Sequence, residues 1–169
     1  DTYEKLLTAV KEQIAYLCDG VCSMANKAQR IFAEYSANPI RSMTIEGCIE
    51  KGLSYFEGGP IYNVISPHIG GLADTVNSLY AIKKLVFEEK KVSFSELMRI
   101  LKNNWEGEEE LRRYVMNRYV YYGNDSDEVD AIAARIVKLL AKEVNGTPNQ
   151  KGGKYRLGLF SINWRWEFG

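Results

Sequence analysis

The stretch Phe56–Phe87, FEGGPIYNVISPHIGGLADTVNSLYAIKKLVF, decides how the rest of the chain is arranged. Two glycine pairs, Gly58-Gly59 and Gly70-Gly71, bracket a short β-rich run from Pro60 to Ser66. Glycine adopts backbone angles that are closed to other residues, so each pair marks a sharp change of direction. The stretch therefore predicts a buried strand, a tight loop and an amphipathic helix. This is half of a β/α unit, and α/β folds usually place their chemistry in such loops.

The composition limits the classes of protein to which the chain can belong. Its 169 residues are 46% hydrophobic, which is enough for the core of one domain. Twenty-two basic and 22 acidic residues give zero net charge, which argues against binding to nucleic acid or to a membrane surface. No apolar run approaches the ~20 residues that cross a bilayer, and no signal peptide is present. We expect a cytoplasmic protein whose two ends, Asp1 and Gly169, are cut from something larger.

Most of the remaining sequence predicts amphipathic helices. Apolar residues recur at intervals of three and four from Tyr3 to Tyr35, which indicates one long helix that could bend near Gly20. Asn38-Pro39 ends this helix and starts a second one. The second helix is expected to bury the apolar side chains of Met43, Ile45, Cys48, Ile49 and Leu53.

Further elements are predicted from local start and stop signals. The pairs Ser93 with Glu96 and Asp125 with Glu128 are capping boxes, and another helix is expected from about Glu108. Asn145-Gly146 is typical of a helix end. From Tyr155 to Phe168 the sequence alternates with period two, which predicts a strand with Ser161 and Asn163 on its polar face.

The three cysteines do not form a disulfide framework, and their odd number suits a reducing cytoplasm. Cys18 and Cys22 share one face of the first helix and could be metal ligands. A radical-SAM cluster would need CxxxCxxC, and Ala25 occupies the third position. Buried structural thiols explain the pair better, because free cysteine is among the most buried residue types.

Two single residues are candidates for catalysis. Cys48 precedes Glu50 by two residues, but we place this thiol mid-helix on the buried stripe, whereas reactive thiols are exposed. His68 is the only histidine and lies in the Ser66-Pro67-His68 turn, where it is either structural or a hydrogen-bond donor and proton shuttle. A stand-alone hydrolase that uses Cys48 and His68 is one alternative.

Two further features could bind ions but have simpler explanations. The turn Lys151–Lys154 could hold phosphate with its N–H groups, although a turn before a strand explains it equally well. Asp125, Asp127 and Asp130 crowd the start of a helix without the spacing of a calcium loop. Carboxylates are favourable at a helix N-terminus, so we interpret these acids as a cap.

Four blocks in sequence order resemble the glycyl radical enzymes of the pyruvate formate-lyase type, in particular the dehydratase, decarboxylase and C–N or C–S lyase branch. They are GCIEKGLSYFEGGPIYN, GGLADTVNSLYAIKKLVFEEKK, YYGNDSDEVD and PNQKGGKYRLGLF. The resemblance implies a helix-rich α/β fold, in which residues 1–169 form one segment of a ten-stranded barrel made of two half-barrels. It places this segment between the loop of the catalytic cysteine and the loop of the radical glycine. No catalytic residue of the family can therefore be assigned to this chain.

The resemblance also implies a mechanism and partners for the complete protein. A radical-SAM activase generates a glycyl radical on a glycine outside this chain, and a cysteine thiyl then abstracts hydrogen from a small-molecule substrate. A closed barrel would exclude water from this chemistry. No bound cofactor or metal is implied for the segment itself. Its expected partners are the substrate, the activase, the remainder of its own polypeptide and a second copy in a homodimer.

The segment would contribute barrel wall and substrate-pocket residues. The candidates are Glu57, Tyr62, Ser66, His68, Ser161 and Asn163. Each of them could instead simply fill the barrel lumen. In isolation the segment would expose strand edges and an apolar surface, and we expect it to be inactive and to aggregate or associate with a partner. The alternative from another class is a non-catalytic helical scaffold or interaction domain.

Overall fold

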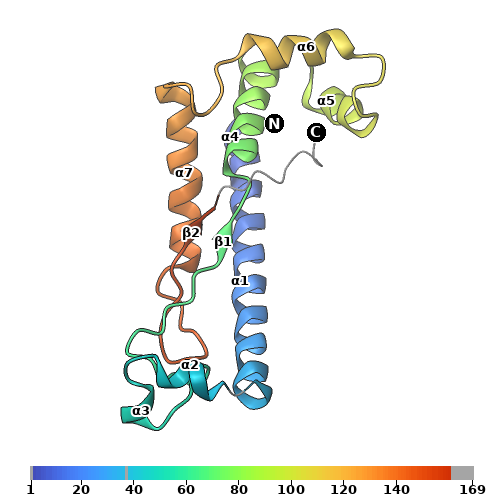
Figure 1. Ribbon diagram of the computed structural model, residues 1–169. Helices are drawn as coiled ribbons and strands as arrows, with labels where there is room; N and C mark the ends of the chain where they lie inside the picture. The colour runs from blue at the N-terminus through green and yellow to red at the C-terminus, as the bar shows by residue number, and fades with distance from the viewer. Residues whose placement is uncertain (1, 37, 161–169) are drawn as a thin grey trace. The chain divides into compact units, whose positions relative to one another are not determined.

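The computed structural model describes residues 2–36 and 38–160, which are mainly helical (Figure 1). The elements in chain order are α1 (Tyr3–Tyr35), α2 (Pro39–Met43), α3 (Cys48–Lys51), β1 (His68–Ile69), α4 (Leu72–Ile82), the π-helix η1 (Lys83–Glu88), α5 (Phe94–Lys102), α6 (Glu109–Arg118), α7 (Asp127–Val144) and β2 (Gly158–Leu159). The chain divides into two compact units, one of Asp1–Ala9 with Gly71–Val137 and one of Val10–Gly70 with Lys138–Gly169. The division falls within α1 and α7, so each of these helices contributes to both units.

The first unit is a set of helices around two apolar clusters. One cluster is centred on Val76 and Tyr80 of α4 with Val129 and Ala133 of α7. The other joins Leu85 and Val86 of η1 to Leu97 of α5, with partly buried aromatic side chains around it. The amphipathic helix predicted after Gly71 is therefore confirmed. The helix continues directly into η1, which the sequence pattern did not distinguish from α-helix.

Helix starts in the structure follow the predicted signals in two cases out of three. The Asn38 side chain accepts the N–H of Arg41 at the start of α2, and the Ser93 side chain accepts that of Glu96 at the start of α5. The predicted capping box of Asp125 with Glu128 is wrong. Asp125 has a left-handed φ of 55°, α7 begins at Asp127, and the Glu128 carboxylate instead contacts Lys83 and Lys84.

The predicted strand Pro60–Ser66 is also misplaced. Only Ile65 in this run makes a β-bridge, and the strand β1 lies further on, at His68–Ile69. His68 is therefore a strand residue and not a turn residue. The reason is local: the carbonyl oxygens of Gly58 and Pro60 accept hydrogen bonds from the Asn63 side chain, which holds this run as a compact loop.

The second predicted helix is broken into α2 and α3. Gly47 has a left-handed φ of 95° and lies against the Gly59 backbone, so the chain turns sharply before Cys48. Met43 is 68% and Ile49 69% exposed, whereas Cys48 is buried at the first residue of α3. The prediction of one helix that buries all five apolar positions is therefore wrong.

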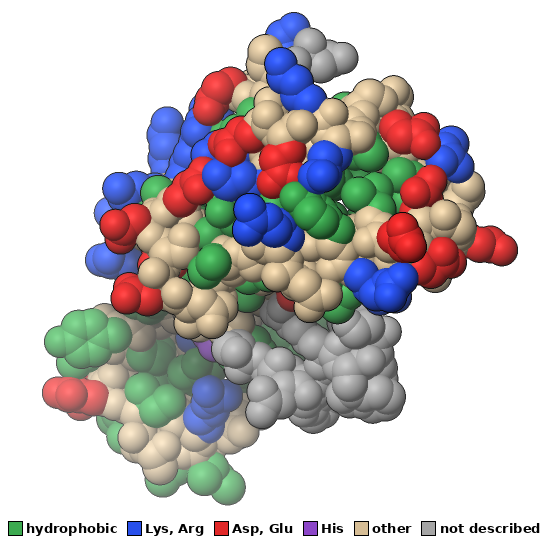
Figure 2. Space-filling model, turned by 90° about the horizontal axis from the view of Figure 1, so that it is seen from above, with side chains coloured by type: hydrophobic (Ala, Val, Ile, Leu, Met, Phe, Trp, Pro, Cys, Tyr) green, Lys and Arg blue, Asp and Glu red, His purple; other side chains and the backbone are tan. Residues whose placement is uncertain are grey.

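Helix α1 runs without a break through Gly20. Beyond its first two turns it carries several exposed apolar side chains, including Leu17, Met24, Phe32 and Tyr35. Within the described residues, no helix combines the length and the apolar character needed to cross a membrane. Figure 2 shows acidic and basic side chains interspersed on the face in view, in line with the zero net charge.

Candidate functional site

The two short strands bring together segments that are far apart in the sequence. Strands β1 and β2 pair in parallel, with His68 opposite Gly158. The carbonyl oxygens of Ile65, Pro67 and Ile69 each accept a backbone N–H from the opposite segment, at 3.0 to 3.1 Å. This ladder fixes which side chains of the two segments become neighbours, because alternate residues of a strand share one face.

Ser66 and His68 lie next to Gly158 on one face of the pair. A Cβ added to Gly158 would lie 2.4 Å from Cδ2 of His68 and 2.7 Å from Oγ of Ser66. The imidazole also packs on the ring of Phe160, with 5.4 Å between ring centroids and 30° between the planes. The structure thus brings two of the predicted pocket residues together, and it adds Gly158 and Phe160, which sequence reasoning did not select.

A compact loop precedes this strand. The Asn63 side-chain amide donates to the carbonyl oxygens of Gly58 and Pro60 at 3.0 and 2.8 Å. The Lys51 ammonium also donates to Pro60, at 2.9 Å. Gly58 has a left-handed φ of 95°, and a Cβ there would lie 2.6 Å from the carbonyl oxygen of Lys151. Only glycine meets both requirements, because it has no Cβ and tolerates this conformation.

Asn149 joins this loop to the turn before β2. Its side-chain oxygen accepts the backbone N–H groups of Lys151 and Gly153 at 3.0 and 3.1 Å, and its amide donates to the Asn63 carbonyl at 2.6 Å. The N–H of Gly152 donates to the Asn149 carbonyl. The N–H groups of Lys151, Gly152 and Gly153 are therefore occupied within the turn. This favours the turn interpretation of Lys151–Lys154 over a phosphate site.

Two positively charged side chains from distant segments lie close to the Tyr55 ring. The Lys151 ammonium lies 3.6 Å and the Arg41 guanidinium carbon 3.7 Å from the ring centroid. Lys151 is only 7% exposed, although lysine is almost never fully buried without a partner. Sequence reasoning missed this group, because no local spacing relates positions 41, 55 and 151.

Comparisons with known proteins find matches over nearly the whole chain. The family model described as pyruvate formate lyase-like matches residues 1–169. The (2S)-3-sulfopropanediol dehydratase of Klebsiella oxytoca is 34% identical over 96% of this chain, and the trans-4-hydroxy-L-proline dehydratase of Clostridioides difficile is 34% identical over 99%. A structure from work on 1,2-propanediol dehydration in Roseburia inulinivorans matches 99% of this chain with a TM-score of 0.90 and 30% identity.

The chain belongs to the pyruvate formate lyase-like family of glycyl radical enzymes. The resemblance drawn from the four sequence blocks is therefore confirmed. The chain spans about a fifth of the relatives it matches: 20% and 21% of the two dehydratases and 22% of the Roseburia protein. It therefore corresponds to one segment of these longer proteins.

Two other predicted pocket residues of this pyruvate formate lyase-like chain, Glu57 and Tyr62, face solvent. Glu57 is exposed, and its carboxylate accepts the N–H of Ser54 at 2.9 Å. Hydrogen bonds from Ser54 lower the pKa of Glu57, so this side chain stabilises its own turn. Tyr62 is 85% exposed. Ser161 and Asn163 lie outside the described residues.

The thiols of the pyruvate formate lyase-like chain are buried. Cys18 and Cys22 are 7% and 6% exposed, as predicted, and burial raises the pKa of both thiols. Cys48 is 3% exposed and packs against Gly59, where an added Cβ would lie 2.8 Å from the sulfur. A buried thiol cannot meet a substrate, which counts against the hydrolase alternative. Among the described residues no three His, Cys, Asp or Glu side chains are grouped to hold a metal ion.

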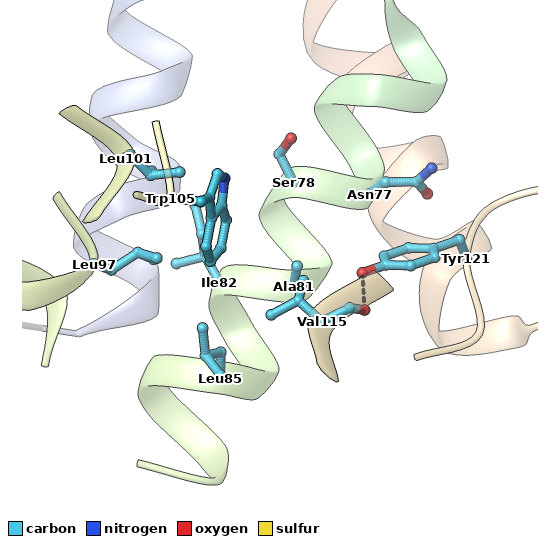
Figure 3. A pocket seen from close by; sticks show the side chains of 10 residues that line it. All are labelled: Asn77, Ser78, Ala81, Ile82, Leu85, Leu97, Leu101, Trp105, Val115 and Tyr121. Carbon is cyan, nitrogen blue, oxygen red and sulfur yellow. Dashed lines mark hydrogen bonds between the residues drawn. The ribbon is translucent and has the colours of Figure 1, made fainter. Parts of the chain in front are cut away.

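The first unit contains an apolar hollow of about 230 Å³ between α4, α5 and α6 (Figure 3). Trp105 and Leu97 face Ile82 and Leu85 across it, and Asn77 and Ser78 lie on its polar side. The Asn77 side-chain oxygen already accepts the N–H of Tyr122, which leaves this hollow with little polar chemistry. It does not share residues with the Ser66–His68 group.

Proposed function

We propose that the complete protein is a glycyl radical lyase of the dehydratase type, which removes a hydroxyl group from a small polar substrate. The finer assignment rests on the named relatives, which include dehydratases of a sulfonated diol and of hydroxyproline. The same radical chemistry can also cleave a C–C, C–N or C–S bond. Because this chain spans about a fifth of its relatives, it would supply wall and pocket residues and neither radical residue.

The observation that carries the proposal is the parallel pairing of β1 with β2. Residues 70–157 separate the two strands and contain α4, η1, α5, α6 and α7. Two parallel strands need a crossover connection, and the repeated strand–helix–strand unit is the building block of α/β barrels. The pair would form two adjacent strands of the family's ten-stranded barrel, with Ser66, His68 and Phe160 turned toward the lumen.

In this arrangement the polar side chains bind and orient the substrate. The Ser66 hydroxyl and the His68 imidazole would hydrogen-bond to the hydroxyl groups of the substrate, and Phe160 would contact its carbon skeleton. Loss of water requires that the departing hydroxyl gain a proton, and histidine is the side chain best suited to transfer one near neutral pH. The glycyl radical would supply the hydrogen-atom abstraction. Glu57 and Tyr62 are retained as further pocket candidates. Ser161 and Asn163 remain candidates only if the alternation predicted from Tyr155 to Phe168 is broken after Phe160, because they fall on the opposite face of that pattern.

The proposal includes the partners that such chemistry requires. They are a radical-SAM activase, the remainder of the polypeptide and a second copy of the protein. The exposed apolar side chains of α1 and α2, such as Leu17, Phe32 and Ile40, support a covering surface on the rest of the protein.

The test is activation of the full-length protein without oxygen. Incubation with its activase, S-adenosylmethionine and a reductant should produce a glycyl radical signal by electron paramagnetic resonance. The activated protein should then dehydrate at least one substrate from a panel of 1,2-diols, hydroxyproline and sulfonated diols. We expect His68→Gln to lower kcat by at least ~10²-fold, as is usual when a general acid is lost, without lowering the radical signal. Absence of any radical would reject the proposal and favour the scaffold alternative.

A further inference from the structure

We infer that Lys151 and Arg41, acting through Tyr55, are positioning residues that set the placement of Ser66 and His68 in the pocket. This inference rests on the proposed function and names residues in it that do not themselves touch the substrate. The structure supports it in three steps: the geometry of the stack, the connection from the stack to the strand, and the burial of the lysine.

Two cations lie against the Tyr55 ring. Both are 3.6 to 3.7 Å from the ring centroid. Because two like charges repel at short range, we place one cation on each face of the ring. A cation is attracted to the negative face of an aromatic ring, and the attraction increases as water is excluded. The ring therefore links the start of α2, which carries Arg41, to the turn that carries Lys151.

The turn transmits this placement to the strand. The Lys151 N–H donates to the Asn149 side chain, and the Lys151 carbonyl oxygen lies near Gly58, where an added Cβ would be 2.6 Å from it. Asn149 also holds the carbonyl of Asn63, three residues before Ser66. A Cβ on Gly153 would lie only 1.8 Å from that same carbonyl oxygen, so the two segments are in direct backbone contact at this point.

The ladder of β1 and β2 begins immediately beyond this contact. Its first bridge joins Ile65 to Tyr155, and its last pairs are His68 with Gly158 and Ile69 with Leu159. A strand pair this short has few hydrogen bonds of its own to set the register. A slip of one residue would turn the His68 side chain to the other face. The Tyr55 stack stabilises one end of the ladder and thereby the position of the imidazole at its other end.

The burial of Lys151 distinguishes it from the neighbouring lysine. Lys151 is 7% exposed with its ammonium on the Tyr55 ring, whereas Lys154, in the same turn, is exposed. The turn uses the backbone N–H of Lys151. An exposed lysine would therefore serve it equally well if the side chain had no further role. Lys154→Met therefore serves as a matched control for Lys151→Met.

The experiment uses the full-length protein after activation and measures three quantities: radical content, kcat and KM. For Lys151→Met we expect normal radical content and a loss in kcat/KM of about tenfold to a hundredfold, shared between a lower kcat and a higher KM, because His68 both transfers the proton and binds the substrate. This range follows from the cost of displacing a binding group by ~1 Å. Lys151→Arg, which keeps a cation over the ring, should recover most of the loss, and Lys154→Met should match the wild type.

Other outcomes separate the explanations. General destabilisation would reduce radical content and kcat together and leave KM unchanged, which would overturn the inference. If Lys151→Met does not yield folded protein, Arg41→Met decides the question, because Arg41 is exposed and its loss should be tolerated. Wild-type kcat and KM in Arg41→Met would then refute the inference. A wild-type protein that forms no radical would refute the proposed function instead.

Discussion

Replacing Glu128 by glutamine should loosen the contact between α7 and the α4–η1 helix. Glu128 Oε1 lies 2.5 Å from the Lys83 ammonium, and Oε2 lies 2.9 Å from that of Lys84. The Tyr80 hydroxyl also donates to Oε2, at 3.3 Å. The substitution removes one negative charge from this group and leaves Glu88 as the remaining carboxylate between two lysines.

The size of the effect follows from the exposure of the group. The side chains of Lys83, Lys84 and Glu128 are 28%, 20% and 38% exposed, which places the cluster between a surface pair and a buried one. Exposed ion pairs contribute about 0.2–1 kcal/mol each, and hydrogen bonds to charged groups about 1.5–3 kcal/mol. Glutamine keeps an oxygen acceptor, so we expect a loss of about 1–2 kcal/mol in the local free energy of opening.

Hydrogen–deuterium exchange of the full-length protein measures this loss directly. Backbone N–H groups in η1 and in the first turns of α7 should exchange about 5–30 times faster in Glu128→Gln than in the wild type. Asp130→Asn is the matched control, because Asp130 is exposed in the same part of α7. Equal exchange rates in the two variants would refute the argument, because only the helix-terminus charge would then matter.

The effect should also depend on pH. Hydrogen bonds from Lys83 and then Lys84 lower the pKa of Glu128 in the folded protein. The stabilisation is therefore fully present above the ordinary glutamate pKa, about 4.3, and is lost as the pH falls through the lowered folded value. The difference between wild type and Glu128→Gln should shrink in that acidic range. A difference that persists undiminished at the lowest pH at which the protein stays folded would contradict an ionic origin.

Three further predictions concern the second unit. Gly158→Ala should lower kcat/KM of the activated protein by roughly tenfold to a hundredfold, because the added methyl group displaces His68. Unchanged kinetics would show that activity does not require the close contact of His68 with Gly158. Tyr155→Phe should lower the free energy of unfolding by ~0.5–1.5 kcal/mol in denaturant titrations, because it removes the buried hydroxyl that contacts the Cys22 carbonyl and the Asn26 side chain. An unchanged free energy of unfolding would contradict this. Burial raises the pKa of the Cys18 and Cys22 thiols, so iodoacetamide at neutral pH should label them only after unfolding, and rapid labelling of the native protein would disprove their burial.

Sequence patterns predicted the features whose causes are local. The helix from Tyr3 to Tyr35 follows from apolar residues at intervals of three and four, and the starts at Asn38 and Ser93 follow from side chains that cap N–H groups three residues later. The glycine pair at Gly58-Gly59 indicated a sharp turn, and Gly58 does adopt a left-handed conformation. In each case the residues that determine the structure lie within a few positions of one another.

The errors arise where a local signal competes with a distant or unexpected partner. Glu128 has the spacing of a capping residue, but two lysines from another helix provide stronger partners for its carboxylate. The run from Pro60 to Ser66 has the composition of a strand, but Asn63 takes up the carbonyl oxygens of Gly58 and Pro60. Composition alone does not show which of two hydrogen-bond partners a group will take.

The sequence by itself determined the family, the helical segments and two residues of the candidate pocket, Ser66 and His68. Only the tertiary structure decided that these two residues meet at Gly158 and that Arg41 and Lys151 both lie against the Tyr55 ring. The physical reason is distance along the chain. Helix periodicity and caps act over three or four residues, whereas these contacts join the loop after α3 to the turn after α7 and exist only once the chain has folded.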